Sequence, residues 1–400
     1  MYASQHRRRD RRMVPALALV GLGAMTACSD LAEPLAVSGG PSDNPVAHGP
    51  RDGGRDLTVL THNTYVGADL APLFGADPTA PDFLSVVNAA WTAVQQSEIA
   101  ERAEALADEI ADGAPHVVGL QEVFQFVEFD ASSGTPTVVQ TLDMLQALMA
   151  ALGSRGLDYS LAGVQVNTSG ALPLAALPTN PPTFTRFVQF ADADVVLARG
   201  DVDLQGSAAG AFQDDVPLPG GLILSRGWVR VELEHGGTTY HVVNTHLEGQ
   251  SLPSVQAAQV DELLESVLAG LDGVTVLIGD LNSDAAAGPG APSWTPTYDR
   301  LLDAGFVDAW VQAHPGGNRP GYTCCQDPDL RNAASNLDER IDFVLVRSGN
   351  HPGPSWRLPG RISADVVGDE LSDLTDPTGL WPADHAGLLA SLRLAPVVVQ

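Results

Sequence analysis

Lysine is absent from this chain. All 21 basic residues among its 400 are arginine, whereas 49 residues are acidic, which gives a formal net charge of −28. Without lysine the protein has no lysine nucleophile and cannot form a Schiff base with a substrate. The negative charge argues against a large basic surface that binds nucleic acid phosphates non-specifically. Chemistry on phosphate groups stays open, because a bound divalent cation can invert the local field at a site.

Cysteine is scarce as well, with three residues in the chain. Cys28 lies near the N-terminus, and Cys324 and Cys325 are adjacent in "GYTCCQDPDLRN". Two neighbouring cysteines without a second pair make a poor zinc site. In an oxidising compartment they favour a disulfide between neighbours, and two buried free thiols are the alternative.

Long hydrophobic runs are also missing. The apolar stretch from Met13 to Ala27 follows five arginines and is too short for a convincing transmembrane span. Residues 1–27 are therefore predicted to be a secretory signal peptide. Arg11 and Arg12 fit a twin-arginine signal poorly, and no other run of the sequence is long and apolar enough to cross a bilayer. We expect an exported protein.

The last residues of the predicted signal peptide indicate whether the protein is attached to the membrane. "MTAC", Met25 to Cys28, resembles a bacterial lipoprotein box, in which the cysteine is lipidated and becomes the new N-terminus. The resemblance implies a protein anchored to the membrane through Cys28, on the periplasmic or cell-surface side. Plain cleavage after Ala27, which gives a secreted protein, is the alternative. Residues 28–55 are rich in Gly, Pro, Ser and Asp and are predicted to be a flexible tether.

Folded structure is predicted at residues 56–396. The 44% hydrophobic content supports a sizeable core. A strand pattern at 57–61 is followed by helical spacing of Ala, Leu, Ile and Val from 81 to 112, with Ser97 as a candidate cap, and then by a buried strand at 117–120. This succession and the strands that return up to residue 395 indicate one large α/β domain. We expect a monomer.

Residues 124–220 are less regular and are predicted to be an insertion. A helix is expected in "TLDMLQALMAALGSRG", and strands are expected in "YSLAGVQV" and "FVQFADADVVLAR". Between the two strands, the proline-rich "GALPLAALPTNPPT" predicts a surface loop over or beside a cleft, and an uninvolved insertion is the alternative.

Polar residues stand at or next to the ends of the aliphatic runs. They are Asn63, Glu122, Asn244, His246, Asp280, Asn282, Asp342, Asp384 and His385. A rigid α/β scaffold aims such strand-end groups at one point. In "LIGDLNSD", strand alternation places Asp280 and Asn282 on the same face, although both types are also common turn formers. Carboxylates, an amide and two histidines around a cation are what phosphodiester hydrolysis requires.

Seven segments in order resemble the endonuclease/exonuclease/phosphatase superfamily. They are "THNTYVG", "VVGLQEV", "GLILSR", "VNTHLEG", "LIGDLNSD", "RIDFVLV" and "ADHAGLLASL", which span about residues 57–395. The superfamily includes pancreatic-type deoxyribonuclease, abasic-site endonucleases, inositol polyphosphate 5-phosphatases and neutral sphingomyelinases. The resemblance implies a four-layer α/β/β/α sandwich of two mixed sheets flanked by helices, and a metal-dependent hydrolase of phosphoester bonds.

The resemblance also implies a metal site. Glu122 corresponds to the main carboxylate ligand of the metal, and Asn63 stands beside it as a metal-site or phosphate-orienting residue. Asp384 corresponds to a metal-shell carboxylate or a partner of His385. An oxygen-rich site of this kind suits Mg²⁺ or Mn²⁺.

The remaining residues are implied to act on the phosphate. Asp280 orients or deprotonates the attacking water, and Asn282 hydrogen-bonds the phosphate. His246 binds a phosphate oxygen, and His385 contacts the scissile phosphate or transfers a proton. Asp342 pairs with and orients a histidine, whereas pairing with Arg340 or another arginine alone is the structural alternative.

The sequence leaves three questions open. The superfamily usually supplies a tyrosine or arginine to the phosphate, and Arg186, Asp194 and Arg226 lie in the right region without matching well. The substrate is a phospholipid headgroup such as that of sphingomyelin, extracellular nucleic acid, or a small phosphate ester. A surface binding module of the same fold that lost turnover is the alternative to an enzyme.

Overall fold

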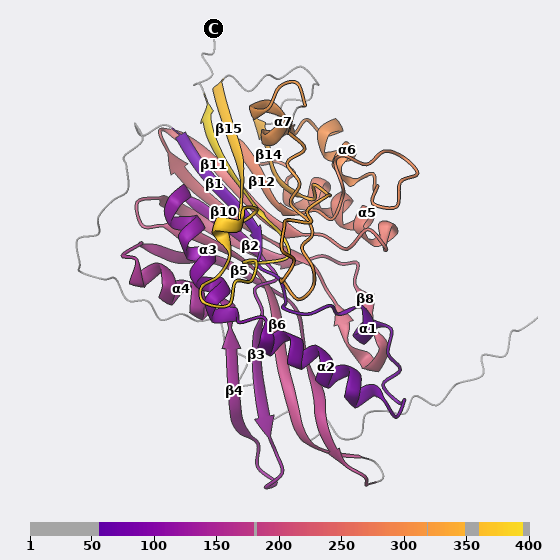
Figure 1. The fold of residues 1–400 in the computed structure, drawn as a ribbon. Helices are drawn as coiled ribbons and strands as arrows, with labels where there is room; N and C mark the ends of the chain where they lie inside the picture. Colours follow the sequence, from indigo (N-terminus) through magenta and orange to yellow (C-terminus); the bar gives the residue numbers. More distant parts are fainter. Residues whose placement is uncertain (1–55, 180–181, 318, 349–359, 395–400) are drawn as a thin grey trace, which may run out of the picture.

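The fold is a sandwich of two β-sheets covered by helices. A computed structural model describes residues 56–179, 182–317, 319–348 and 360–394 (Figure 1). The predicted signal peptide, Cys28 and the tether lie outside these residues. Among the helices that are described, none is both long enough and apolar enough to cross a membrane.

The first sheet has the strand order β15-β16-β1-β2-β6-β3-β4, and β5 pairs with β6. Its strands are β1 (Asp56–Asn63), β2 (Val117–Gln121), β3 (Gln125–Asp130), β4 (Thr137–Asp143), β5 (Tyr159–Leu177), β6 (Thr183–Arg199), β15 (Gly360–Val367) and β16 (Gly387–Leu394). β1 and β2 are parallel, and the other pairs are antiparallel.

The second sheet has the order β13-β14-β12-β11-β10-β7. Its strands are β7 (Asp203–Ala211), β10 (Gly227–His235), β11 (Thr238–His246), β12 (Val274–Asp280), β13 (Val307–Asp308) and β14 (Asp342–Ser348). β11 and β12 are its parallel pair. A separate two-stranded sheet joins β8 (Val216–Pro217) to β9 (Ile223–Leu224).

The helices are α1 (Ala71–Phe74), α2 (Phe83–Gln96), α3 (Ile99–Gly113), α4 (Met144–Ser154), α5 (Pro253–Glu262), α6 (Thr297–Asp303) and α7 (Ala309–Ala313), with π-helical η4 (Leu263–Val267) after α5.

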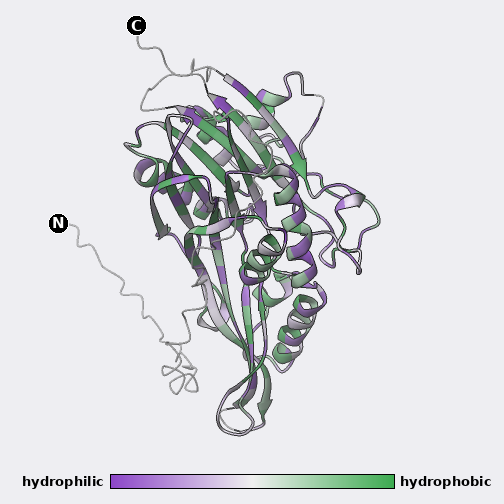
Figure 2. Cartoon of the chain, turned by 90° about the vertical axis from the view of Figure 1, so that its left-hand side faces the viewer, coloured by the Kyte–Doolittle hydropathy of each residue, from purple (hydrophilic) through white to green (hydrophobic). Residues whose placement is uncertain are grey.

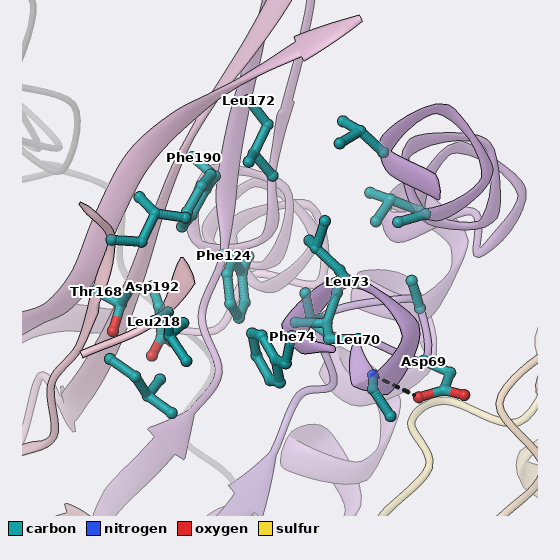
Figure 3. A pocket seen from close by; sticks show the side chains of 18 of the residues that line it. Asp69, Leu70, Leu73, Phe74, Phe124, Thr168, Leu172, Phe190, Asp192 and Leu218 are labelled. Carbon is teal, nitrogen blue, oxygen red and sulfur yellow. Dashed lines mark hydrogen bonds between the residues drawn. The ribbon is translucent and has the colours of Figure 1, made fainter. Parts of the chain in front are cut away.

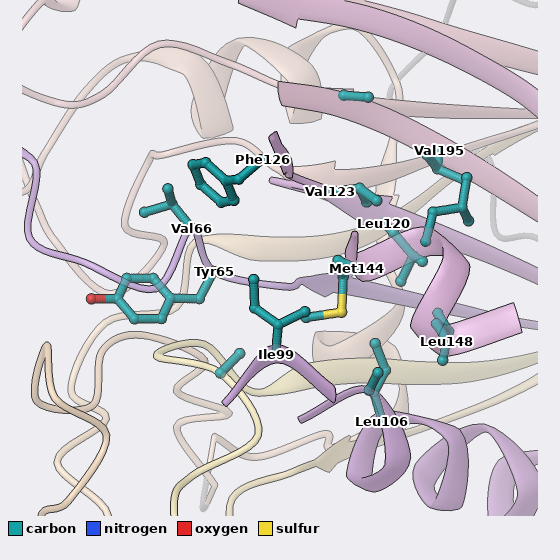
Figure 4. Packing of buried hydrophobic residues seen from close by; sticks show 14 of the residues in the cluster. Tyr65, Val66, Ile99, Leu106, Leu120, Val123, Phe126, Met144, Leu148 and Val195 are labelled. Carbon is teal, nitrogen blue, oxygen red and sulfur yellow. The ribbon is translucent and has the colours of Figure 1, made fainter. Parts of the chain in front are cut away.

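Three hydrophobic clusters lie between the four layers of helices and sheets. One cluster lies under α2, α3 and α4 (Figure 4). Another fills the space between the sheets, and the third lies under α5, η4 and α6. The four-layer α/β/β/α prediction is confirmed.

Alternation along the strands assigns side chains to these layers. In β2, Val117 faces the second sheet and Val118 faces the helices, because successive side chains of a strand point to opposite faces. Hydrophobic residues accordingly run along the strands at the centre of the molecule, whereas the helices carry both hydrophobic and hydrophilic stretches (Figure 2).

Asn244 joins the two sheets instead of entering a site. Its Nδ2 donates to Leu120 O at 2.9 Å and to Val195 O at 3.1 Å, and its Oδ1 accepts from Gln121 Nε2 at 2.5 Å. A Cβ at Gly119 would lie 2.7 Å from this Oδ1, so glycine allows the amide to come this close. The buried amide is thus satisfied by the opposite sheet.

The helical pattern predicted over residues 81–112 is confirmed, and it is divided into two helices next to Ser97, the candidate cap. α2 ends at Gln96, and α3 begins at Ile99. Glu98 between them has φ 48°, and a left-handed residue cannot continue the repeat of i to i−4 hydrogen bonds.

The proline-rich segment predicted as a surface loop is mostly strand. β5 and β6 form a long hairpin that leaves 178–182 as its connection. Pro173 fits because β5 has β6 as its one partner in the sheet, and the register shifts between Pro173 and Ala175. Residues 124–220 supply β3 to β7, of which β6 lies between β2 and β3. In Figure 1 this hairpin and the β3-β4 hairpin extend beyond the sandwich, with α2 alongside.

His116 gives the fold a measurable pH dependence. Its Nδ1 accepts from Thr58 N at 3.0 Å, and burial, with Arg199 and His235 nearby, lowers its pKa from 6.5 to about 4. A depressed histidine pKa contributes stability above pH 6.5 that is lost as the pH falls toward 4.

We therefore expect His116→Asn, which keeps an acceptor but does not titrate, to gain stability relative to wild type on going from pH 7 to pH 4. The expected gain is on the order of 1 to 3 kcal/mol. Urea unfolding of both proteins at several pH values measures it, and parallel pH profiles would contradict the assignment.

Candidate active site

One edge of the sandwich gathers the polar strand ends. The parallel strands β1 and β2 end there at Asn63 and Gln121, with Glu122 next in the chain. β11 and β12 end there at His246 and Asp280, which are partners in the register. The antiparallel β14 starts at Asp342 opposite Asp280, and β16 starts after Asp384 and His385. Since both sheets present the same edge, residues far apart in sequence meet.

Asp280 is the centre of this group. Its Oδ2 accepts from Asn63 Nδ2 at 3.1 Å and lies 3.4 Å from His246 Nε2 and 3.9 Å from His385 Nε2. Its Oδ1 accepts from the backbone N of Asn282 at 2.9 Å. Burial raises the pKa of Asp280 to about 7, with Asp342 adding to the shift and His385 opposing it. The bond from Asn282 N is an Asx-turn, so Asp280 both forms the turn after β12 and faces two histidines and an amide from the other sheet.

His385 is held by Asp342. Its Nδ1 donates to Asp342 Oδ2 at 2.8 Å, and the backbone N of Asp342 donates to Thr323 Oγ1 at 3.2 Å. Burial alone would lower the pKa of His385, but the neighbouring carboxylates of Asp342, Asp280 and Asp384 outweigh it and raise this pKa well above its ordinary value. Arg340 pairs with Asp308 at 2.6 Å. Asp342 therefore pairs with a histidine, and the alternative in which it pairs with Arg340 alone is wrong.

Glu122 lies on the other side of Asn63. Its Oε2 accepts from Val66 N at 2.9 Å, and its Oε1 accepts from Asn63 Nδ2 at 3.3 Å. Glu122 has φ 53° and Asn282 has φ 48°, both in the left-handed region. Such conformations cost on the order of 1 kcal/mol or more and persist where the surrounding structure imposes them.

Asp384 completes the acidic side of the site. Its Oδ1 is buried and has no hydrogen-bond partner within the described ranges 56–179, 182–317, 319–348 and 360–394. Burial raises the pKa of Asp384 to about 7; His385 and Arg102 oppose the shift, and Glu122 adds to it.

The residues at this edge fit a divalent cation. Glu122, Asp384, Asp280 and Asn63 supply carboxylate and amide oxygens, the donors that Mg²⁺ and Mn²⁺ prefer. Ligand atoms of Asp280, Asp342 and His385 lie within 4.8 Å of one another. Buried carboxylates with raised pKa values and an unsatisfied carboxylate oxygen are what a bound cation would compensate.

Comparison with known proteins agrees with this arrangement. The sequence model of the Endonuclease/Exonuclease/phosphatase family matches residues 60–385. The chain belongs to this family. The match runs from β1 to His385 and so includes every strand end that carries a predicted site residue. No curated protein matches the chain.

The solved structures that resemble this chain share little sequence identity with it. The endonuclease/exonuclease/phosphatase from Beutenbergia cavernae is 22% identical with a TM-score of 0.49, over 85% of this chain and 72% of that one. A family protein from Leptotrichia buccalis is 14% identical with a TM-score of 0.49, over 84% and 98%. Truncated Caenorhabditis elegans TDP2 is 17% identical with a TM-score of 0.46, over 85% and 98%. The assignment to the family rests on the sequence match and not on these similarities.

Among the three candidates for a phosphate-facing residue in this family member, Arg226 is the one in the site. Its Nη1 lies 3.0 Å from His246 Nδ1, and its Nη2 lies 3.6 Å from Glu248 Oε1. Arg186 pairs with Glu128 on β3. Asp194 is fully buried beside Arg226 and the backbone of His246, and as an anion it would repel a phosphate. Arg226 is the last residue of "GLILSR", one of the seven segments, and it lies between β9 and β10.

Arg226 also helps to keep the ring of His246 uncharged. Burial lowers the pKa of His246, and Arg226 and His385 lower it further, so the ring is neutral. Arg226 approaches Nδ1, and Nε2 faces Asp280 Oδ2 at 3.4 Å. Asn282 Nδ2 lies 3.0 Å from the same Nε2 and 3.0 Å from Leu247 O.

The adjacent cysteines lie against the loop that carries His385. Cys324 and Cys325 are joined by a disulfide, the first of the two alternatives. Around them, Ala386 N donates to Thr323 O at 2.8 Å, and Gln326 N donates to Asp384 O at 2.7 Å. The disulfide segment thus backs the Asp384 and His385 loop.

Arg102 fixes the chain after Asn63. Its guanidinium is buried on α3 and donates to Ser97 O at 2.9 Å, Thr64 O at 2.7 Å and Tyr65 O at 3.2 Å. Burial lowers the pKa of Arg102 to about 10, which leaves it charged at neutral pH. One side chain therefore satisfies the carbonyls of both the α2-α3 turn and the segment that follows β1.

Replacing Arg102 by glutamine is expected to destabilise the protein by about 3 kcal/mol or more, because buried carbonyls lose their donors. Arg155→Gln is the matched control: Arg155 pairs with the exposed Glu104 and Asp108, and its loss should cost less than about 1 kcal/mol. Denaturant midpoints measure both effects, and equal losses would contradict the role given to Arg102.

Proposed function

We propose that the protein is a divalent-metal-dependent hydrolase of phosphoester bonds. The observation that carries the proposal is the placement of Asp280, which is buried between Asn63 of the other sheet and the two histidines His246 and His385. Acid, base and amide groups so placed can act on one phosphorus atom. The family match agrees with phosphoester chemistry.

The metal is proposed to be Mg²⁺ or Mn²⁺, held by Glu122, Asn63 and Asp384. Bound there, it would polarise a phosphoryl oxygen and neutralise charge in the transition state. Asn63 also hydrogen-bonds Asp280 and Glu122, so it links the metal side of the site to the carboxylate that handles water.

The attacking water is assigned to Asp280. The backbone N–H of Asn282 holds Oδ1 and the Asn63 amide holds Oδ2, which together fix the carboxylate that orients the water and accepts its proton. A base fixed in this way needs no reorientation in the transition state.

The phosphate is assigned to the histidines and Asn282. His246 presents its Nε2 to the space beside Asp280, where it would contact a non-bridging oxygen, and the Asn282 amide is within reach of the same oxygen. His385, charged and held by Asp342, contacts the scissile phosphate or gives a proton to the leaving oxygen. Arg226 supports His246 from behind.

Turnover of bis(p-nitrophenyl) phosphate by residues 56–400 tests this proposal. Wild type is expected to be active with Mg²⁺ or Mn²⁺ and inactive after chelation with EDTA. Asp280→Asn and His385→Gln should each lower kcat by about 10²- to 10⁴-fold, because each removes a proton-transfer group. Asp299→Asn, an exposed position on α6, is the control and should keep full activity. Metal-independent turnover, or an active Asp280→Asn variant, would overturn the proposal.

Export and anchoring are a separate proposal. We propose that residues 1–27 are removed and that Cys28 is lipidated, as "MTAC" indicates. Full-length protein produced in a bacterium should then fractionate with membranes, and Cys28→Ser should move it to the soluble fraction, whereas Ser29→Ala should not. The intact mass of the detergent-extracted protein shows the lipid directly. A soluble wild type that begins at Cys28 without a lipid would establish plain cleavage.

A further inference from the structure

A cavity of about 450 Å³ opens beside the acidic side of the site. Its lining is mostly apolar, from α1, α2, β3, β5, β6 and the β8-β9 segment. The apolar side chains include Leu70, Leu73, Phe74, Phe83, Val87, Phe124, Phe126, Leu172, Val188, Phe190, Leu218, Leu222 and Leu224. In Figure 3, Phe124 and Phe190 stand opposite Leu73 and Phe74, with Asp192 and Thr168 at one edge.

The polar end of this cavity is the candidate active site. Glu122 and Asp384, the proposed metal ligands, line it together with Arg226 and Glu248. A phosphate bound to the metal would therefore have one of its ester oxygens at the mouth of the apolar space. The cavity is continuous with the chemistry and is not a separate surface groove.

Core packing does not account for this space. Protein interiors are close-packed, and an apolar void costs stability in proportion to its volume. A volume of about 450 Å³ falls within the range of small-molecule sites. Phe124 and Phe126 stack in its wall with ring centroids 5.3 Å apart, and Phe74 remains 39% exposed at α1. Apolar side chains kept in contact with an open cavity indicate a ligand that covers them.

The lining also selects the chemistry of that ligand. Its apolar part offers few hydrogen-bond partners to the edge of a nucleobase. Carboxylates of Asp192 and Glu248, which are not among the proposed metal ligands, would repel a second phosphate group at the polar end. An uncharged alkyl or aryl group avoids both penalties and gains from burial.

We propose that this pocket binds the apolar ester group of the substrate, so that the enzyme prefers phosphodiesters in which one substituent is an alkyl chain or an aryl ring. The inference rests on the proposed function, since it places the scissile phosphate at the metal site. It narrows the substrate class from phosphoesters in general to hydrophobic phosphoesters.

The test is a series of alkyl p-nitrophenyl phosphates, from methyl to octyl, below their micelle concentrations and with Mg²⁺. Water adds to phosphorus, the bond from phosphorus to the nitrophenyl oxygen breaks, and alkyl phosphate, p-nitrophenolate and a proton are formed. We expect kcat/KM to rise about fourfold per methylene, the rate equivalent of burying each CH₂, until the pocket is full.

Two variants of one helix make the comparison specific. Ala90 lines the pocket from α2, and Ala90→Phe should fill it and flatten the dependence on chain length while methyl p-nitrophenyl phosphate is still hydrolysed. Its neighbour Ala89 is exposed and does not line this pocket, so Ala89→Phe should keep the wild-type dependence. Wild-type rates and alkyl phosphate affinities that are both independent of chain length, with turnover intact, would overturn the pocket assignment and leave the proposed hydrolase standing.

Binding provides a readout that needs no turnover. Calorimetry with methyl to octyl phosphate in the presence of Mg²⁺ should show affinity that rises with chain length in wild type and Ala89→Phe but not in Ala90→Phe. If this pattern of affinities occurs but no diester is hydrolysed, the pocket assignment is supported and the proposed hydrolase function is overturned. If affinity is independent of chain length, the pocket assignment is wrong whatever the rates are.

Discussion

The hydrogen bond from Asn63 Nδ2 to Asp280 Oδ2 joins the ends of two strands that belong to different sheets. It forms because the sheets pack face to face with the carboxyl ends of β1, β2, β11 and β12 at the same edge. Sliding one sheet by a single residue along its strands would move an end by about 3.3 Å and break this contact. The inter-sheet amide of Asn244 and the close approach at Gly119 fix that relation deeper in the sandwich.

Holding the site together works against the stability of the chain. Burial raises the pKa values of Asp280 and Asp384, so the folded protein without a cation disfavours their charged forms. Glu122 and Asn282 sit in left-handed conformations, where a non-glycine residue is strained. The compensation comes from three hydrophobic clusters and from Arg102, which donates to four backbone carbonyls, those of Thr64, Tyr65, Ser97 and Pro382. Packing and hydrogen bonds elsewhere in the fold therefore offset the destabilisation caused by the buried and strained residues of the site.

The sequence predicted the parts of this arrangement that depend on short-range patterns. Asp280 and Asn282 follow an aliphatic run directly, so their position at a strand end could be predicted. Arg226 could not be placed, because its role depends on where His246 of the next hairpin lies. Ser97 marked the place of the break between α2 and α3, but the form of the turn depends on contacts distant from that pattern: Glu98 is left-handed, and Arg102 binds the carbonyl of Ser97. Proline suggested a loop at Pro173, whereas the strand tolerates it where its register shifts.

The proline-rich stretch and the strands around it, within residues 124–220, also connect the fold to the proposed preference for apolar ester groups. Strand ends on both sheets supply the groups assigned to chemistry, but β5, β6 and the β8-β9 segment, within or just after residues 124–220, supply much of the apolar wall beside them. Had the proline-rich stretch been a free loop, Leu172 would have had no fixed position opposite α2. Because it is a strand paired with β6, its side chains are held at constant distance from the polar end. In the proposed enzyme, a rigid wall next to the phosphate would discriminate between ester groups by size and polarity without involving the residues assigned to the chemistry at phosphorus.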